Sequence, residues 1–259
     1  LHELDTFEVM AYRSIMGVFV VLVIAKASGT INEINIQQLR LHLTRNITHF
    51  VGQNLWFFAL NAITLAQLFA FEFSVPVWVA LFAPFFLSEK LTLKRFMAAS
   101  IGFIGILIVA RPDEIGLTPG ILAAALCAIC FTGTGIATKL LTRKQSITCI
   151  LFWLTMMQTI FGVICAGYDF QITVPSKSTL PWVVVIGFAG LTAHFCITRA
   201  LQLADAMVVY PMDFVRLPIA TAIGVLFFDE PVQIFVFIGA IIILGANFLN
   251  IMSSRNTQT

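Results

Sequence analysis

Charge is the scarcest property of this 259-residue chain. Only 11% of its residues are Asp, Glu, Lys or Arg, whereas about 25% is typical of a soluble domain. Hydrophobic residues make up 59% of the chain. Because a globular core of this size cannot hide so much apolar surface from water, the composition excludes an ordinary soluble protein and predicts one embedded in a lipid bilayer. The net charge of +2 is too small to indicate a nucleic-acid partner, and we expect none.

The residues that usually build catalytic and metal sites are also few. The chain has four histidines and five cysteines, and it contains neither an HExxH motif nor a Walker motif. Cys127 and Cys130 have CxxC spacing, but no second CxxC and no nearby histidine accompany them, so we interpret them as small buried hydrophobic residues. We therefore expect no enzymatic activity, no metal, no cofactor and no ATP-driven step within this chain.

Long apolar runs are what the chain has in abundance. Runs of about 20 apolar residues are long enough to cross a bilayer as helices. Nine such runs are present, with approximate limits 8–25, 44–63, 65–87, 93–110, 117–137, 147–168, 180–199, 206–227 and 232–252. They are longer than barrel strands and do not alternate with period two, so the sequence predicts an all-α integral membrane protein.

Lysine and arginine are concentrated in alternate connections between these runs. The clusters are Lys26, Arg40 and Arg45, then Lys90, Lys94 and Arg95, then Lys139, Arg143 and Lys144, with Arg255 near the end. The positive-inside rule places all of them in the cytoplasm. This orientation puts the first residue outside and makes residues 254–259 a cytoplasmic C-terminal tail of an inner-membrane protein.

Two segments of the chain resemble each other. Residues 58–91 can be laid over residues 198–232, so that Glu72 meets Asp213 and Glu89 meets Glu230. This repeat divides the chain into halves at residues 1–112 and 116–253. The second half has five runs and the first has four, so we expect one further helix before the first residue. Halves of five helices insert in opposite senses, which predicts two inverted repeats, with nine helices here and ten in all.

The ends of the two halves share a motif. It consists of a proline, an apolar run, a Phe/Leu-x-Glu ending and a glycine-containing last helix. Its residues are Pro84 to Leu91 (PFFLSEKL), Gly102 and Gly105 in the first half, and Arg199 to Leu201, Pro218, Phe227 to Glu230, Gly239 and Gly245 in the second. The pattern resembles the EamA-domain transporters of the drug/metabolite transporter superfamily. That resemblance implies ten helices in two inverted halves, enclosing a central cavity through which small metabolites move.

Ionisable groups inside apolar runs are the strongest indication of a site. A charged side chain at a helix centre costs about 2.5–3.5 kcal/mol on insertion scales, and such residues normally face the bundle interior or a wet cavity. We predict a substrate-binding cavity lined by Arg216, Glu72, Asp213, Tyr210, Arg13, Asn54, Gln53, Trp56 and His194. The guanidinium of Arg216 could hold a carboxylate or phosphate. Glu72 or Asp213 could bind an amine or exchange a proton.

Structural roles for the same residues remain open. Arg216 with Asp213, and Arg13 with Glu72, could be pairs that only let the helices pack, and polar groups such as Gln53 also join helices in lipid. We expect His49 to lie at the membrane interface, Glu89 to cap or anchor the helix that follows it, and the 206–227 run to be kinked by its prolines.

A secondary active transporter is the function that these features favour. We expect it to move a small polar or zwitterionic metabolite, such as an amino acid, by alternating access. A nucleoside-like or vitamin-type substrate is the alternative, and an intramembrane enzyme, a channel or a scaffold is disfavoured. Protons or a counter-substrate are the candidate coupling partners, and the sequence is compatible with a monomer or a homodimer.

Overall fold

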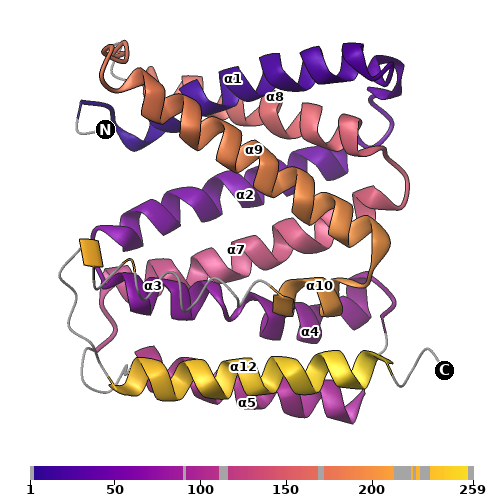
Figure 1. Cartoon of the computed structure of the whole chain (residues 1–259), viewed down its shortest axis with the longest axis vertical. Helices are drawn as coiled ribbons and strands as arrows, with labels where there is room; N and C mark the ends of the chain where they lie inside the picture. The colour runs from indigo at the N-terminus through magenta and orange to yellow at the C-terminus, as the bar shows by residue number, and fades with distance from the viewer. Residues whose placement is uncertain are drawn as a thin grey trace. The chain divides into compact units, whose positions relative to one another are not determined.

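The computed structural model describes residues 3–89, 92–110, 116–168, 172–212, 223, 226–227 and 234–255. Every regular element in these ranges is a helix, which confirms the predicted all-α class (Figure 1). The elements are α1 (Thr6–Ala27), η1 (Ile31–Glu33), α2 (Leu39–Leu60), α3 (Leu65–Glu72), α4 (Val75–Phe86), α5 (Leu93–Ala110), α7 (Pro119–Thr142), α8 (Ile147–Ala166), α9 (Leu180–Leu203), α10 (Ala206–Met212) and α12 (Ile234–Arg255).

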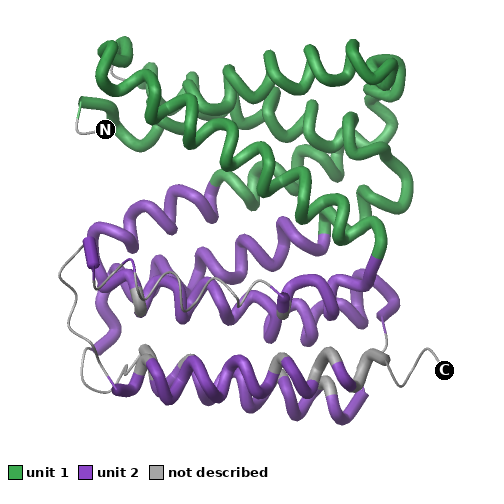
Figure 2. The backbone as a smooth tube through the Cα atoms, in the orientation of Figure 1, with its two compact units in different colours: residues 1–50, 137–203 green, residues 51–136, 204–259 purple. Residues whose placement is uncertain are grey.

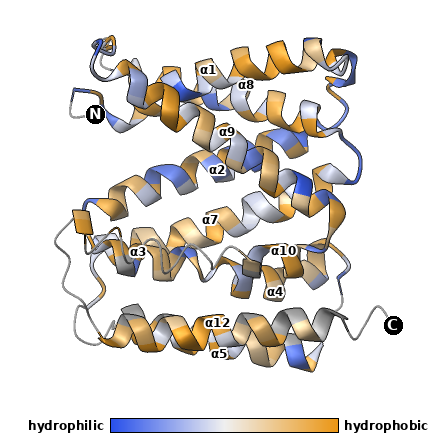
Figure 3. Ribbon diagram, in the orientation of Figure 1, coloured by the Kyte–Doolittle hydropathy of each residue, from blue (hydrophilic) through white to orange (hydrophobic). Residues whose placement is uncertain are grey.

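Helix length and hydropathy confirm a multi-pass membrane protein. Five helical stretches of the described chain are long and apolar enough to cross a bilayer: Thr6–Ala27, Gln67–Phe86, Pro119–Thr142, Ile147–Ala166 and Leu180–Leu203. Large apolar side chains are also exposed on the helices, such as Phe19 at 68% and Phe85 at 82%. Hydrophobic residues dominate most helices in Figure 3, while α2 carries several hydrophilic patches. Lipid is the medium that makes such surfaces favourable.

The helices form two compact units (Figure 2). Unit 1 comprises residues 1–50 and 137–203, and unit 2 comprises residues 51–136 and 204–259. Each unit therefore draws helices from both predicted halves of the chain.

Helices at equivalent positions of the two halves pack against each other. In unit 1, α1 packs along α8, and in unit 2, α5 packs along α12 while α4 contacts α10 (Figure 1). Elements related by a two-fold axis meet in this self-complementary way, so the pairing agrees with the repeat read from the sequence. Small residues allow the close approach: a Cβ on Gly162 of α8 would lie 2.9 Å from the Cα of Ala11 in α1.

The predicted 65–87 run is broken in its middle. Helix α3 ends at Glu72 and α4 begins at Val75, with Phe73 and Ser74 between them. Pro76 lies in the first turn of α4, where it has no N–H to donate to the carbonyl of Glu72 and its ring crowds that carbonyl. Proline thus interrupts this span beside its only carboxylate. The kink expected in the 206–227 run falls mostly on residues 213–222, outside the described residues.

The α5–α12 contact generates a first prediction. A Cβ added at Gly105 would lie 2.8 Å from Cγ1 of Ile243 and 3.0 Å from the carbonyl oxygen of Gly239. Gly105→Ala should therefore destabilise the protein by about 1–3 kcal/mol, the usual cost of overpacking, and lower its melting temperature in detergent. Gly245→Ala is the control, because nothing lies within 4 Å of that position. Equal melting temperatures for the two variants would show that the packing is looser than described.

Candidate functional site

The residues predicted to bind substrate are found in both units. Arg13 and His194 belong to unit 1, on α1 and α9. Gln53, Asn54, Trp56, Glu72 and Tyr210 belong to unit 2. Asp213 and Arg216 lie outside the described residues, so their place in a cavity stays a prediction. We describe the sites of each unit in turn.

In unit 2, Trp56 and Glu72 form a hydrogen-bonded pair. Nε1 of Trp56 donates to Oε2 of Glu72 at 2.8 Å, and both side chains are half-buried. The indole ring also makes edge-to-face contacts with Phe57 and Phe69, at centroid distances of 5.4 and 6.4 Å. Glu72 is the last residue of α3, where the helix dipole disfavours a negative charge. Helix stability therefore does not explain the carboxylate at this position, and its role in substrate binding stays a prediction.

A short connection brings this pair together. Helix α2 ends at Leu60, and Thr64 begins α3 with a capping box in which Thr64 and Gln67 exchange hydrogen bonds between side chain and backbone. Ala59 and Leu68, one from each helix, share a buried apolar cluster. Packing across this turn brings Trp56 to Glu72, 16 residues further along the chain.

Three other predicted residues of unit 2 are partly buried. Gln53, Asn54 and Tyr210 are all of intermediate exposure. Oε1 of Gln53 is buried and accepts no hydrogen bond from the described residues. The ring of Tyr210 lies directly against Gly135 of α7, where any Cβ would overlap the Tyr210 hydroxyl. Glycine at position 135 is therefore required for this placement of Tyr210.

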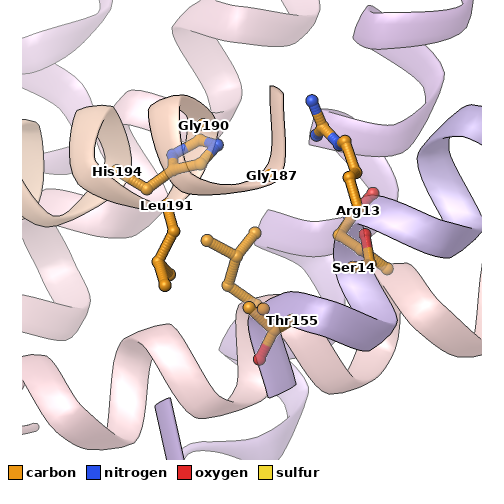
Figure 4. Close-up of a pocket in the computed structure, with 10 residues that line it drawn as sticks. Arg13, Ser14, Thr155, Gly187, Gly190, Leu191 and His194 are labelled. Atoms are coloured by element: carbon orange, nitrogen blue, oxygen red, sulfur yellow. The ribbon is translucent and has the colours of Figure 1, made fainter. Parts of the chain in front are cut away.

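In unit 1, Arg13 and His194 line one cavity of about 30 Å³ (Figure 4). The cavity lies between α1, α8 and α9, and its other lining residues are Ser14, Gly17, Leu154, Thr155, Gln158, Gly187, Gly190 and Leu191. Its volume matches one water molecule. The structure thus brings two of the predicted site residues to one cavity, although they are far apart in the sequence.

A buried polar cluster adjoins His194. Nη2 of Arg45 lies 3.5 Å from Nδ1 of His194, and the His49 ring meets the His194 ring edge-to-face at 4.7 Å. Arg45 also donates through Nε to Oγ1 of Thr138 at 3.3 Å and through Nη1 to Oδ1 of Asn46 at 2.8 Å. Several polar partners therefore hold the guanidinium, as burial requires.

Sequence reasoning missed this cluster. It counted Arg45 among the cytoplasmic charges and placed His49 at the interface, yet the side chains are only 1% and 5% exposed. Their placement relative to the membrane stays a prediction, but their burial was not foreseen, because nearness to the end of an apolar run does not determine burial. Residues 45, 49 and 53 are spaced by four, which places their side chains on one face of a helix. That spacing was the signal available in the sequence.

Glu89 caps a helix that the sequence did not indicate. Its carboxylate is buried and accepts hydrogen bonds from the backbone N–H groups of Ala206, at 3.2 Å, and Met207, at 3.4 Å. These residues begin α10, not the helix that follows Glu89. The first N–H groups of a helix have no partner within it and favour a negative charge, so Glu89 caps a helix in the other half of the sequence.

The family of the chain follows from comparison with known proteins. Residues 1–111 and 118–252 match the EamA-like transporter family. The chain belongs to this family. One solved crystal structure shares its fold with a TM-score of 0.75, at 19% identity over 95% of this chain and 89% of the other.

Curated relatives of this EamA chain are named as metabolite transporters. It is 25% identical over 257 residues to an S-adenosylmethionine uptake transporter of Rickettsia bellii, covering 99% of this chain and 87% of the relative. It is 30% identical over 222 residues to a riboflavin transporter of Brucella anthropi, covering 84% and 78%. The EamA chain is therefore a transporter of a small metabolite.

The cap on α10 gives the second prediction. Glu89→Ala removes acceptors from two N–H groups and should lower stability by about 1–2 kcal/mol, as the loss of a helix cap does. Glu89→Gln, which keeps one acceptor, should lose less. Both effects can be measured as melting temperatures of the purified protein. Glu33→Ala, at an exposed position, should melt as the wild type does, and the same result for Glu89→Ala would exclude the cap.

Proposed function

We propose that this EamA protein is a secondary transporter for a metabolite that joins a planar nitrogen heterocycle to a ribose or polyol chain. Its relatives are named for S-adenosylmethionine and riboflavin, and both compounds contain a planar heterocycle joined to such a chain. The relatives thus favour the nucleoside-like or vitamin-type alternative over the amino acid that we expected first. We place the protein in the bacterial plasma membrane with a cytoplasmic C-terminus, in line with its distribution of basic residues.

The pair of Trp56 and Glu72 is the observation that carries this proposal. Stacking of a nucleobase on an aromatic side chain is worth about 1–3 kcal/mol, and the half-buried indole of Trp56 offers such a face. Its hydrogen bond to Glu72 fixes the orientation of the ring before substrate arrives, which reduces the entropy lost on binding. The carboxylate of Glu72 can accept hydrogen bonds from a ring N–H or a hydroxyl, and can attract a cationic substrate.

The position of this pair fits alternating access. Many secondary transporters bind substrate where a transmembrane helix is discontinuous. Here the break between α3 and α4 directly follows Glu72. Arg216 and Asp213 remain proposed members of the same substrate pathway, with Arg216 suited to an anionic substrate group.

Counterflow in proteoliposomes tests the function. Vesicles loaded with unlabelled riboflavin or S-adenosylmethionine should take up the corresponding labelled compound faster than empty vesicles do. Substrate inside the vesicle accelerates uptake only if the protein is a carrier that reorients with bound substrate. A pore does not reorient, so loading would not accelerate its uptake. If loading the vesicles does not change the rate of uptake of either compound, the proposal is contradicted.

The third prediction concerns Trp56 and Glu72. Trp56→Leu removes the stacking face and should raise the half-saturation concentration about 10-fold or more, in line with the stacking energy. Glu72→Gln keeps an acceptor for the Trp56 N–H but loses the charge, so it should weaken transport of cationic S-adenosylmethionine more than that of neutral riboflavin.

Trp78→Leu is the matched control for Trp56→Leu. Trp78 is also half-buried in unit 2, and its Nε1 donates to Oγ of Ser74 at 3.0 Å. Loss of a tryptophan at this position should leave the half-saturation concentration unchanged. Equal effects of the two substitutions would assign Trp56 a role in packing alone.

A further inference from the structure

A groove of about 490 Å³ lies within unit 1, between α1, α8 and α9. These three helices contact one another (Figure 1). The buried side chains of Val21, Ala25 and Leu151 line it, and they form its floor. Large apolar side chains that are exposed, such as Ile24 and Phe188, form its walls. The groove therefore opens toward the surroundings of the helices, which in a membrane protein are lipid.

The apolar part of the groove suits a lipid tail but does not select one lipid. Its volume lies within the range of about 300–1,000 Å³ that is usual for ligand pockets. Lipid tails are as apolar as leucine side chains, so contacts with a tail give little preference for one lipid over another. Any selectivity of this groove must come from the polar and charged groups at its end.

Hydroxyl groups line one end of the groove. Ser28 and Thr30 follow α1, and Thr148 lies in the first turn of α8. Oγ of Ser28 is 3.0 Å from Oγ1 of Thr30, and Oγ1 of Thr148 donates to Oγ1 of Thr30, also at 3.0 Å. This end of the groove is therefore polar, and it suits the headgroup of a lipid whose tail lies against the apolar part.

The two connections at this end are held together by a pair of hydrogen bonds. Nδ2 of Asn35, between α1 and α2, donates to Oε1 of Gln145, between α7 and α8, at 3.0 Å. Nε2 of Gln145 donates in return to Oδ1 of Asn35 at 3.2 Å. Charged residues of both connections are therefore found at the same end of unit 1 as the hydroxyl groups.

Those charges are mostly positive. Lys26 lies in the last turn of α1, and Lys144 precedes α8 by three residues. Both are exposed, and neither makes a hydrogen bond or ion pair within the described residues. Arg40 and Arg143 are also exposed here, whereas Glu33 contributes the one carboxylate of residues 26–40 and 143–148. Because basic residues near a membrane surface attract anionic lipids, this end favours a negatively charged headgroup.

We propose that the groove is a binding site for an anionic phospholipid. An acyl chain lies between α1 and α9, and the phosphate lies beside Lys26 and Lys144. The distribution of basic residues predicts that this end faces the cytoplasmic leaflet, which carries a negative surface potential. The site is formed by unit 1 alone and does not depend on the substrate that the protein transports.

Native mass spectrometry of the full chain tests the site, because it resolves each bound lipid by its mass. The purified protein is delipidated in detergent and titrated with phosphatidylglycerol, which is anionic, or with phosphatidylcholine of the same acyl chains, which has no net charge. The wild type should bind the first phosphatidylglycerol about 10-fold more tightly than the first phosphatidylcholine, as expected for two lysines beside an anionic headgroup.

Lysine variants test the charged end. Lys26→Gln and Lys144→Gln should each lower the preference for phosphatidylglycerol about threefold, and the double variant should bring it near 1. Lys177→Gln is the matched control. Lys177 is also exposed, but it lies between α8 and α9, at the opposite end of α8 from Lys144. This variant should keep the wild-type preference.

A bulky substitution tests the apolar part. Thr192 lines the groove and is exposed, so Thr192→Trp fills space in the groove without disturbing the buried core. Both lipids should bind several-fold more weakly to this variant, and the preference for phosphatidylglycerol should remain. Val23→Trp is the control, because Val23 is exposed on α1 but does not line the groove. It should bind both lipids as the wild type does.

Several results would overturn the lipid site. Equal affinities of the wild type for the two lipids would do so, as would a wild-type preference in the double lysine variant. Unchanged affinities in Thr192→Trp would show that the lipid lies elsewhere. A wild type that binds neither lipid would leave the groove to a protein segment. None of these results bears on the proposed transport function, which the counterflow assay tests separately.

Discussion

The cost of a polar group inside an apolar helix is the constraint on which this structure depends. Lipid offers no hydrogen bonds, so each polar side chain within a span needs a protein partner or water. Arg45 shows the first solution, since Thr138, Asn46 and His194 surround its guanidinium. Arg13 shows the second, since it faces a water-sized cavity. The same constraint therefore accounts for a hydrogen-bonded cluster around Arg45 and for a small cavity beside Arg13.

The break between α3 and α4 follows from the same constraint applied to the backbone. Pro76 has no N–H to donate to the carbonyl of Glu72, which interrupts the helical hydrogen-bond pattern at this point. The side chain of Glu72 accepts the indole N–H of Trp56 at this point. A backbone interruption, a carboxylate and an aromatic face thus coincide in unit 2. Their coincidence is the reason why we propose this region as the substrate site.

Sequence reasoning predicted those features that depend on neighbouring residues. Hydrophobic length is a local property, so the apolar runs gave the helices, and the carboxylate of Glu72 was conspicuous inside its run. The partner of Glu89 was not predictable, because Ala206 lies 117 residues away and only tertiary packing brings it near. The environment of Gln158, whose Oε1 accepts no hydrogen bond from the described residues, was unpredictable for a related reason. A single amide in an apolar helix does not indicate whether both of its polar atoms find partners.

A transporter requires substrate contacts that are individually weak. A carrier must bind its substrate on one side and release it on the other, so very tight binding would slow the cycle. The proposed substrate contacts, one indole face and one carboxylate, would each contribute on the order of 1–3 kcal/mol, which suits reversible binding. The glycine opposite Tyr210 and the carboxylate that caps α10 instead determine packing within unit 2.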